Sequence, residues 1–284
     1  MTKQHEDMED LPGARANGAE MEHLDRIRTA QSVNISAELF EKLYLNPPNR
    51  VSGDLRQRFA NPTPFIRPLL GFCVAVGALA PALMGWRGAG GGGAANIGAY
   101  YFFGGLLQIL GAIFEWIIGN TFVYVVFGSF GAFWLAFAAT LTPAFNAEEA
   151  DLTGATTAAE QAAGAAQFEA TLAFFIAWIG VIVFMYTICA IRTNVVFLAI
   201  FVILEIAVWL LVAAYWNASV GNASAFATLS KASGACLFTL DVLALYLLFV
   251  QLLGAVDFPF DLPVGDLSHI VPSKSRRTSK RKES

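Results

Sequence analysis

Long runs of apolar residues, separated by short polar or glycine-rich segments, fill the middle of the chain. The hydrocarbon core of a bilayer is about 30 Å thick and an α-helix rises about 1.5 Å per residue, so about 20 apolar residues make one transmembrane span. Six stretches meet this requirement, at residues 69–86, 98–118, 121–141, 171–191, 195–215 and 235–253. The pattern therefore predicts an all-α membrane protein with six transmembrane helices.

The segments around these stretches predict the organisation of the chain. Residues 1–60 are polar and have no hydrophobic signal region, which indicates a mostly disordered tail. Residues 61–255 should form the transmembrane domain, and residues 256–284 a basic tail. Only Gly119 and Asn120 join the second and third stretches, which predicts a tight antiparallel pair with Asn120 as N-cap of the third helix. The alanine-rich segment 142–170 is expected to contain a helical turn or two.

Composition and charge support lipid as the solvent of the middle region. The chain is 56% hydrophobic and 14% charged, with a mean hydropathy of +0.55, whereas a soluble domain carries about 25% charged residues. Of the 18 Lys and Arg residues, 16 lie in the tails or in the short turns on the same side. This imbalance predicts that both termini are cytosolic. The charges are segregated into the tails, which argues against a nucleic-acid partner.

Cysteine and histidine give no sign of an enzyme or a metal site. The three cysteines lie in apolar runs without metal-ligand spacing, and the three histidines lie in the tails. An odd number of cysteines also argues against a disulfide framework. We therefore expect no catalytic residues, no metal and no cofactor.

Three acidic residues interrupt the apolar stretches: Glu115, Glu205 and Asp241. An ionised residue in mid-membrane costs about 2.5 to 3.5 kcal/mol, so such residues usually face a bundle interior or a watery path. No Lys or Arg lies in the same stretches to pair with them. One interpretation is proton binding and release along a pathway. The alternative is that these residues are protonated and fasten helices through hydrogen bonds.

The second stretch carries a stripe of small and polar residues. Its members recur at spacings of three and four and so share one helical face: Gly104, Gln108, Gly111, Ala112, Glu115 and Gly119. Close helix packing explains the glycines. It explains Gln108 and Glu115 poorly, and these two residues indicate a face that meets water or solute. Asn120 and Thr121 follow at the turn, where either a structural role or solute contact is possible.

Several motifs resemble those of a known family. They are NPTP followed by LLGF, FFGGLLQ, FEWIIGNTF, and FGSFGAFWL followed by Pro143 and Phe145. In this order, over about residues 60–255, the chain resembles the acetate uptake transporter family, which includes bacterial succinate–acetate permeases and fungal acetate transporters. The resemblance implies a six-helix protomer in a homo-hexamer, each protomer with its own pore for acetate and similar small monocarboxylates. Transport in such a pore would be proton-linked or channel-like.

The resemblance also implies functional positions. A narrow hydrophobic constriction would fall on Phe72, Phe130 and Leu204. The remaining positions of a substrate or proton pathway would be Asn61 and Pro62 of the Asn-Pro motif, the polar residues Gln108, Glu115, Asn120 and Thr121, and Glu205 beside Leu204. The chain departs from the family pattern at 65–68, where Phe-Ile-Arg-Pro lengthens the gap after the Asn-Pro motif and adds the charge of Arg67.

The leading hypothesis is therefore a multi-pass plasma-membrane transporter of acetate or a related small monocarboxylate. Two alternatives remain: a non-transporting membrane sensor or scaffold, in which the acids only fasten helices, and a pore for ammonia.

Overall fold

The computed structural model describes residues 65–152, 154–260 and 262–267, which all belong to one compact unit, Glu41–Ser284. Six helical segments in this part of the chain are long and apolar enough to cross a membrane. The prediction of an all-α, six-helix membrane protein is confirmed. The predicted tail at 1–60, with Asn61 and Pro62, lies outside the described residues, as does the chain from 268 onward.

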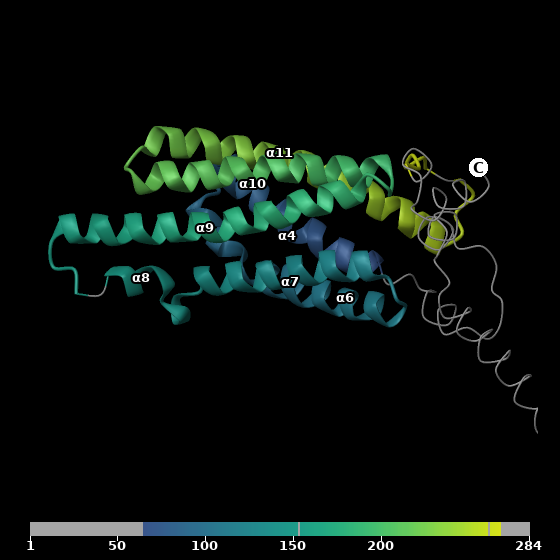
Figure 1. The fold of residues 1–284 in the computed structure, drawn as a ribbon, viewed down its shortest axis with the longest axis horizontal. Helices are drawn as coiled ribbons and strands as arrows, with labels where there is room; N and C mark the ends of the chain where they lie inside the picture. Colours follow the sequence, from purple (N-terminus) through teal and green to yellow (C-terminus); the bar gives the residue numbers. More distant parts are fainter. Residues whose placement is uncertain (1–64, 153, 261, 268–284) are drawn as a thin grey trace, which may run out of the picture. The chain divides into compact units, whose positions relative to one another are not determined.

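The helices follow the predicted order (Figure 1). The first is α4, Ile66–Met84. The second spanning segment is composite, made of α5 (Ile97–Ala99), the π-helix η3 (Tyr100–Leu107) and α6 (Gln108–Ile117). The others are α7 (Thr121–Leu141), α9 (Ala158–Ala190), α10 (Val195–Ser219) and α11 (Ala223–Ala255). Shorter elements connect them: η1 (Trp86–Gly88), η2 (Gly91–Asn96), η4 (Pro143–Phe145) and α8 (Ala147–Leu152).

The helices pack in a closed sequence of neighbours. α10 packs along both α9 and α11, α11 packs on α4, and α4 and α7 both pack on η3 and α6. The remaining seam, between α7 and α9, is closed by side chains. The hydroxyls of Ser129 and Tyr186 are 3.0 Å apart, and the rings of Phe133 and Phe175 stack with centroids 5.8 Å apart. Six helical segments therefore surround a common centre.

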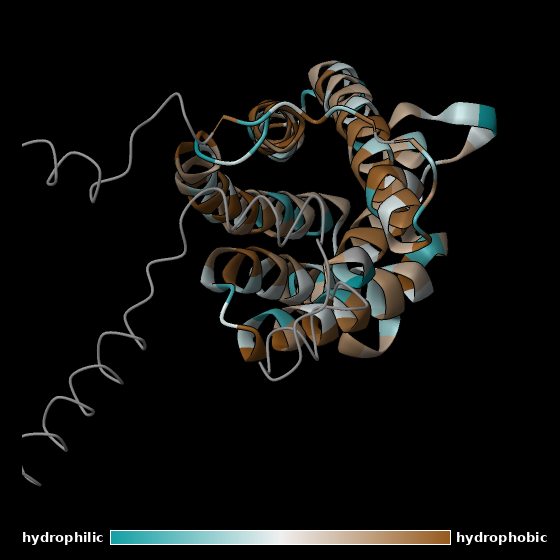
Figure 2. Cartoon of the chain, turned by 90° about the vertical axis from the view of Figure 1, so that its right-hand side faces the viewer, coloured by the Kyte–Doolittle hydropathy of each residue, from teal (hydrophilic) through white to brown (hydrophobic). Residues whose placement is uncertain are grey.

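The outward faces of the helices are strongly apolar. Viewed along the helices, hydrophobic residues dominate them (Figure 2). Large apolar side chains such as Phe102, Trp116 and Trp178 are each about two-thirds exposed. A water-soluble protein rarely shows apolar patches of this extent, whereas a bilayer needs such a surface. The apolar exterior and the six spanning segments together make this a multi-pass membrane protein.

α9 and α11 begin about a dozen residues before the predicted spans. The expectation of only a turn or two in 142–170 is wrong, because a capping box starts α9. The Thr157 hydroxyl accepts from the Glu160 N–H at 3.2 Å and the Glu160 carboxylate accepts from the Thr157 N–H at 2.9 Å. With 33 residues each, both helices are about 50 Å long and exceed the hydrocarbon core.

The tight turn between α6 and α7 is confirmed, and Asn120 is the N-cap residue of α7 as predicted, but the expected capping hydrogen bond is not formed. Gly119 has a φ of 78°, a conformation that costs little only for glycine. Asn120 occupies the N-cap position of α7, yet its side chain makes no capping bond. Its amide instead donates to Glu115, five residues earlier. The Asn120 side chain therefore bonds to Glu115 across the turn instead of capping the first N–H groups of α7.

The chain after α11 returns to the turn between α9 and α10. The Val195 N–H donates to the Gly265 carbonyl at 2.8 Å, and the Leu267 N–H donates to the Thr193 carbonyl at 3.0 Å. The Tyr246 hydroxyl also donates to the Pro263 carbonyl at 2.7 Å. These bonds fasten the segment that follows the last helix to the end of the bundle at which α4 begins.

Candidate functional site

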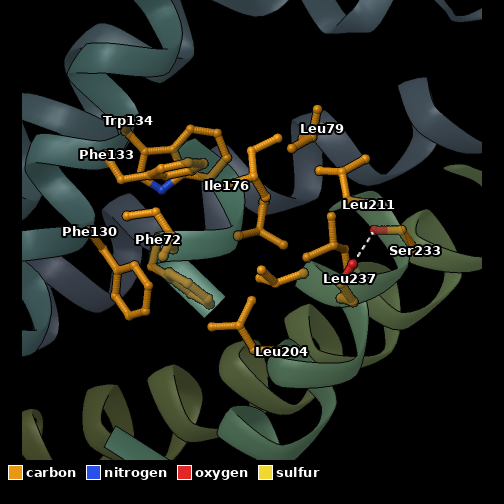
Figure 3. A pocket seen from close by; sticks show the side chains of 14 residues that line it. Phe72, Leu79, Phe130, Phe133, Trp134, Ile176, Leu204, Leu211, Ser233 and Leu237 are labelled. Atoms are coloured by element: carbon orange, nitrogen blue, oxygen red, sulfur yellow. Dashed lines mark hydrogen bonds between the residues drawn. The ribbon is translucent and has the colours of Figure 1, made fainter. Parts of the chain in front are cut away.

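A cavity of about 60 Å³ lies at the centre of the bundle. A buried site needs roughly 10 to 15 Å³ to hold one water, so this space suits a molecule of a few heavy atoms. Five of the six spanning segments line it, and the segment formed by η3 and α6 does not (Figure 3). Its 14 lining residues are Phe72, Val76, Leu79, Phe130, Phe133, Trp134, Ile176, Ile179, Leu204, Ala207, Val208, Leu211, Ser233 and Leu237.

The cavity wall offers almost no polar contact. Ser233 supplies the hydroxyl of the lining, which donates to the Ala207 carbonyl at 2.8 Å, and Trp134 supplies an indole N–H. The hydroxyl hydrogen of Ser233 is therefore used within the protein. An ion entering this space would lose its hydration and find, among the lining side chains, little more than the indole N–H of Trp134 as a possible donor, which is costly. The wall favours a small solute that is weakly hydrated or neutral while it passes.

Phe72, Phe130 and Leu204, at which the resemblance implied a constriction, all line this cavity. They come from α4, α7 and α10, and each is only 6% to 7% exposed. The rings of Phe72 and Phe130 are 6.0 Å apart between centroids. Figure 3 shows the two rings side by side, with the Leu204 side chain nearby. These apolar side chains form a tightly packed part of the wall.

A second group of aromatic rings lies one to two helical turns nearer the end at which α4 begins. Phe65 packs against Phe127 with ring centroids 5.3 Å apart, and against Phe197 at 6.1 Å. Phe197 in turn contacts Phe201, whose ring stacks on Phe130. We call Phe65, Phe127, Phe197 and Phe201 the aromatic plug. Each is at most 7% exposed, so these rings are packed in the interior between the cavity and that end of the bundle.

Glu115 does not reach the cavity. It is fully buried at the end of α6, and its Oε2 accepts from the Asn120 side-chain amide at 2.7 Å. The Asn120 N–H also donates to the Glu115 carbonyl at 2.9 Å. Thr121, the first residue of α7, is exposed. The structure therefore brings Glu115 and Asn120 together at the turn and leaves Thr121 apart.

Gln108 is buried between the second segment and α4. It is 0% exposed, and within the described residues neither of its amide atoms has a hydrogen-bond partner. Gly71 of α4 lies against this part of the second segment, because a Cβ there would clash with the Phe103 carbonyl oxygen and would also lie 3.3 Å from Gln108 Cγ. The predicted stripe forms a buried face from Gly104 to Glu115, whereas Gly119 is exposed in the turn after α6. The buried face packs on Pro68 of α4 and Trp134 of α7 rather than on the cavity.

Glu205 points away from the cavity, although its neighbour Leu204 lines it. It accepts from the Trp209 indole N–H at 2.7 Å, one turn further along α10. Trp209 is 41% exposed, so this pair lies toward the outside of the protomer. Arg67, the additional charge in the lengthened segment, is exposed as well and lies over the Phe114 ring at 5.1 Å.

Sequence reasoning did not find most of the lining. Ile176 and Ile179 of α9 and Leu237 of α11 lie in helices that are apolar on every side, so no stripe marks the inward face. The sequence signal that could have marked an inward position is a small polar residue within an apolar helix, such as Ser233 of α11. Within the part of the chain that the structure describes, no three His, Cys, Asp or Glu side chains gather to hold a metal ion.

Comparison with known proteins identifies the family of this chain. The profile of the GPR1/FUN34/yaaH family matches residues 45–269. The chain belongs to the GPR1/FUN34/yaaH family. This is the family of the acetate transporters that the motifs resemble, so the resemblance is confirmed.

Two fungal relatives and one solved structure of this family illustrate the similarity. Protein alcS of Aspergillus fumigatus is 46% identical over 247 residues, which cover 86% of this chain and 89% of that protein. The acetate transporter protein patA of Aspergillus clavatus is 35% identical over 199 residues, 70% of this chain and 76% of that protein. The structure of the bacterial acetate channel SatP is similar in fold, with a TM-score of 0.51 at 24% identity, over 71% of this chain and 98% of that one.

Proposed function

We propose that this protein carries acetate or a similar small monocarboxylate across the plasma membrane in a channel-like manner. The observation that supports this most is the central apolar cavity, whose wall includes Phe72, Phe130 and Leu204 together. Membership of the family and the names of relatives such as the acetate transporter patA favour acetate as the substrate. Transport rather than catalysis also fits a cavity wall without a reactive side chain.

The proposed passage runs along the centre of the protomer, through the cavity and past the aromatic plug. Hydrophobic constrictions of this kind gate a pore by resisting wetting. Acetate has a methyl group that suits the apolar wall, while its carboxylate must lose water there. A proton taken up on the carboxylate, or supplied by a protein acid, lowers that cost.

The other positions implied by the resemblance belong to this proposal in different ways. Asn61 and Pro62, which lie outside the described residues, belong to it as the Asn-Pro motif that precedes Phe65 in the sequence. Gln108, with its buried and unpartnered amide in the described part of the chain, would face solute if α4 and the second segment moved apart. Glu115, Asn120 and Thr121 would shape the turn at the same end, and Glu205 would act from the outer face of α10.

The assembly and orientation are also proposals. The apolar exterior leaves room for neighbouring protomers, and we propose a homo-hexamer in which each protomer has its own passage. Both termini would lie in the cytosol, because the basic residues are concentrated in the tails and in the turn at Arg192.

A flux assay in proteoliposomes tests the function. At about pH 8 nearly all acetate is ionised, so passive diffusion of the neutral acid is slow. Purified protein should then speed the uptake of labelled acetate above that of protein-free liposomes. Leu204→Trp should fill the cavity and abolish the increase. The matched control Leu252→Trp, at a position 45% exposed on α11, should keep it.

The result that would end the proposal is wild-type flux no greater than that of protein-free liposomes at about pH 6 as well as at about pH 8. Ammonium in place of acetate discriminates the ammonia pore: a rise in ammonia flux without acetate flux would favour that alternative. Neither flux in correctly folded protein would favour the sensor or scaffold.

A further inference from the structure

Asp241 in the middle of α11 is a buried acid that none of the functional positions above includes. Its side chain is 4% exposed and lies against α4. A Cβ on Gly77 would stand 2.8 Å from Asp241 Oδ2, so the carboxyl group occupies the space left by the missing side chain. Oδ1 has no hydrogen-bond partner among the described residues. The seam between α4 and α11 thus holds a buried carboxyl group whose Oδ1 lacks the hydrogen bond that buried polar atoms normally make.

No basic group of the described helices compensates this acid. On α4, Cys73 lies close enough to Asp241 to interact with it electrostatically, and the basic residue Arg67 is exposed over Phe114. On α10, Oε1 of the acid Glu205 accepts from Trp209, and its Oε2 is buried without a hydrogen-bond partner among the described residues. On α11 itself, Lys231 is exposed almost three turns before Asp241, and Tyr246 donates to Pro263.

The position of Asp241 relates it to the cavity. Leu237, four residues earlier and therefore on the same face of α11, lines the cavity. On α4, Cys73 and Gly77 follow Phe72 and Val76, which also line it. Asp241 therefore lies directly behind the wall, at the level of the packed rings of Phe72 and Phe130. A charge there would be about one helix diameter from the centre of the passage.

We propose that Asp241 is a proton-dependent electrostatic gate for anions, a role that rests on the proposed function. With a proton on its carboxyl group, the seam is neutral and acetate passes. When the proton leaves, the uncompensated negative charge behind the wall repels an anion in the cavity. A unit charge about 10 Å away, in a medium of effective dielectric constant about 20, changes the occupancy of an anion by roughly tenfold.

The experiment measures the current carried by acetate through purified protein in planar bilayers, over about pH 5 to 9, a range that includes the titration of buried carboxyl groups. Neutral acetic acid carries no current and so does not contribute. The wild-type current should fall by about tenfold as the pH rises. Asp241→Asn should give a current that stays high across the range, and Asp241→Glu should restore the fall. Glu148→Gln, which removes an exposed carboxylate in α8, should behave as wild type.

A second variant tests the gate without removing the acid. Cys73→Ser changes the thiol beside Asp241 to a stronger hydrogen-bond donor, which stabilises the ionised carboxylate. The midpoint of the fall in current should therefore move to lower pH, an effect that altered packing alone would not produce.

The outcomes separate this inference from the proposed function. Acetate current with an unchanged pH profile in Asp241→Asn, or in Cys73→Ser if the first variant does not fold, would overturn the gate and leave transport standing. A wild-type current that does not depend on pH would also overturn the gate and leave transport standing. Acetate uptake without current would do the same. Loss of both uptake and current in folded wild-type protein would instead refute the proposed function.

Discussion

The hydrogen bond between Asn120 and Glu115 makes a specific prediction about stability. Glu115→Ala removes an acceptor that lies 2.7 Å from the Asn120 amide at a fully buried site. The amide is then left buried without its partner, at a cost of about 1 to 3 kcal/mol. Loss of the packed methylene groups adds about 1 kcal/mol. Glu115→Gln retains an acceptor oxygen and nearly the same volume, so it should cost less than about 1 kcal/mol.

Thermal unfolding of the detergent-solubilised protein measures the difference. Each kcal/mol corresponds to about 2 to 4 °C for a domain of this size. Glu115→Ala should therefore lower the Tm by about 5 to 10 °C, while Glu115→Gln should stay within about 4 °C of wild type. The six tryptophans provide the fluorescence signal, with all variants heated at one scan rate.

A double-mutant cycle isolates the pair. Once Glu115 is alanine, Asn120→Ala removes an amide that no longer has this acceptor. The loss of stability in the double mutant should therefore be smaller than the sum of the losses in the two single mutants, by about 1 kcal/mol or more. Strict additivity, or a Glu115→Gln variant as unstable as Glu115→Ala, would refute the reasoning that this bond fastens the turn between α6 and α7.

Two further predictions concern the plug and the close approach of helices. Phe65→Ala removes the ring that contacts Phe127 and Phe197, so acetate uptake per reconstituted protein should rise severalfold; a rate at or below wild type in folded protein would contradict a closing role for the plug. Gly111→Ala places a Cβ against the Pro68 ring and should lower stability by about 1 to 3 kcal/mol. Gly128→Ala is its control, because the added Cβ would meet only Ala112 at 3.6 Å; equal losses of Tm in the two variants would argue against a specific steric contact.

The fold was predictable where the bilayer dictates the sequence. Six apolar stretches gave six spanning segments, because lipid-exposed backbone must satisfy its hydrogen bonds within a helix. Hydropathy marks the length that the membrane covers, not the ends of a helix. The alanine-rich start of α9 was therefore missed, although Thr157 and Glu160 carry the capping signal. The π-helix at Tyr100–Leu107 has no comparable signal in its composition.

The candidate site was predictable only through the family resemblance. Phe72, Phe130 and Leu204 come from three helices, and no periodicity within one helix shows that they meet. Glu115 shows the opposite failure, because the periodic pattern of polar residues did single it out, but as a residue that faces solute. The structure places it against Asn120, since a glycine turn brings these two side chains within reach. A local pattern identifies a polar face but not its partner.

The hydrogen bonds that join 263–267 to Thr193, Val195 and Tyr246 have a practical consequence for shortening the chain. A protein truncated at Val256, the C-cap residue of α11, would lose all three bonds and expose backbone groups at the corner between α9 and α10. One that stops after Leu267 would keep them. The natural boundary for removing the basic tail is therefore set by this return of the chain, eleven residues beyond the point that the last helix suggests.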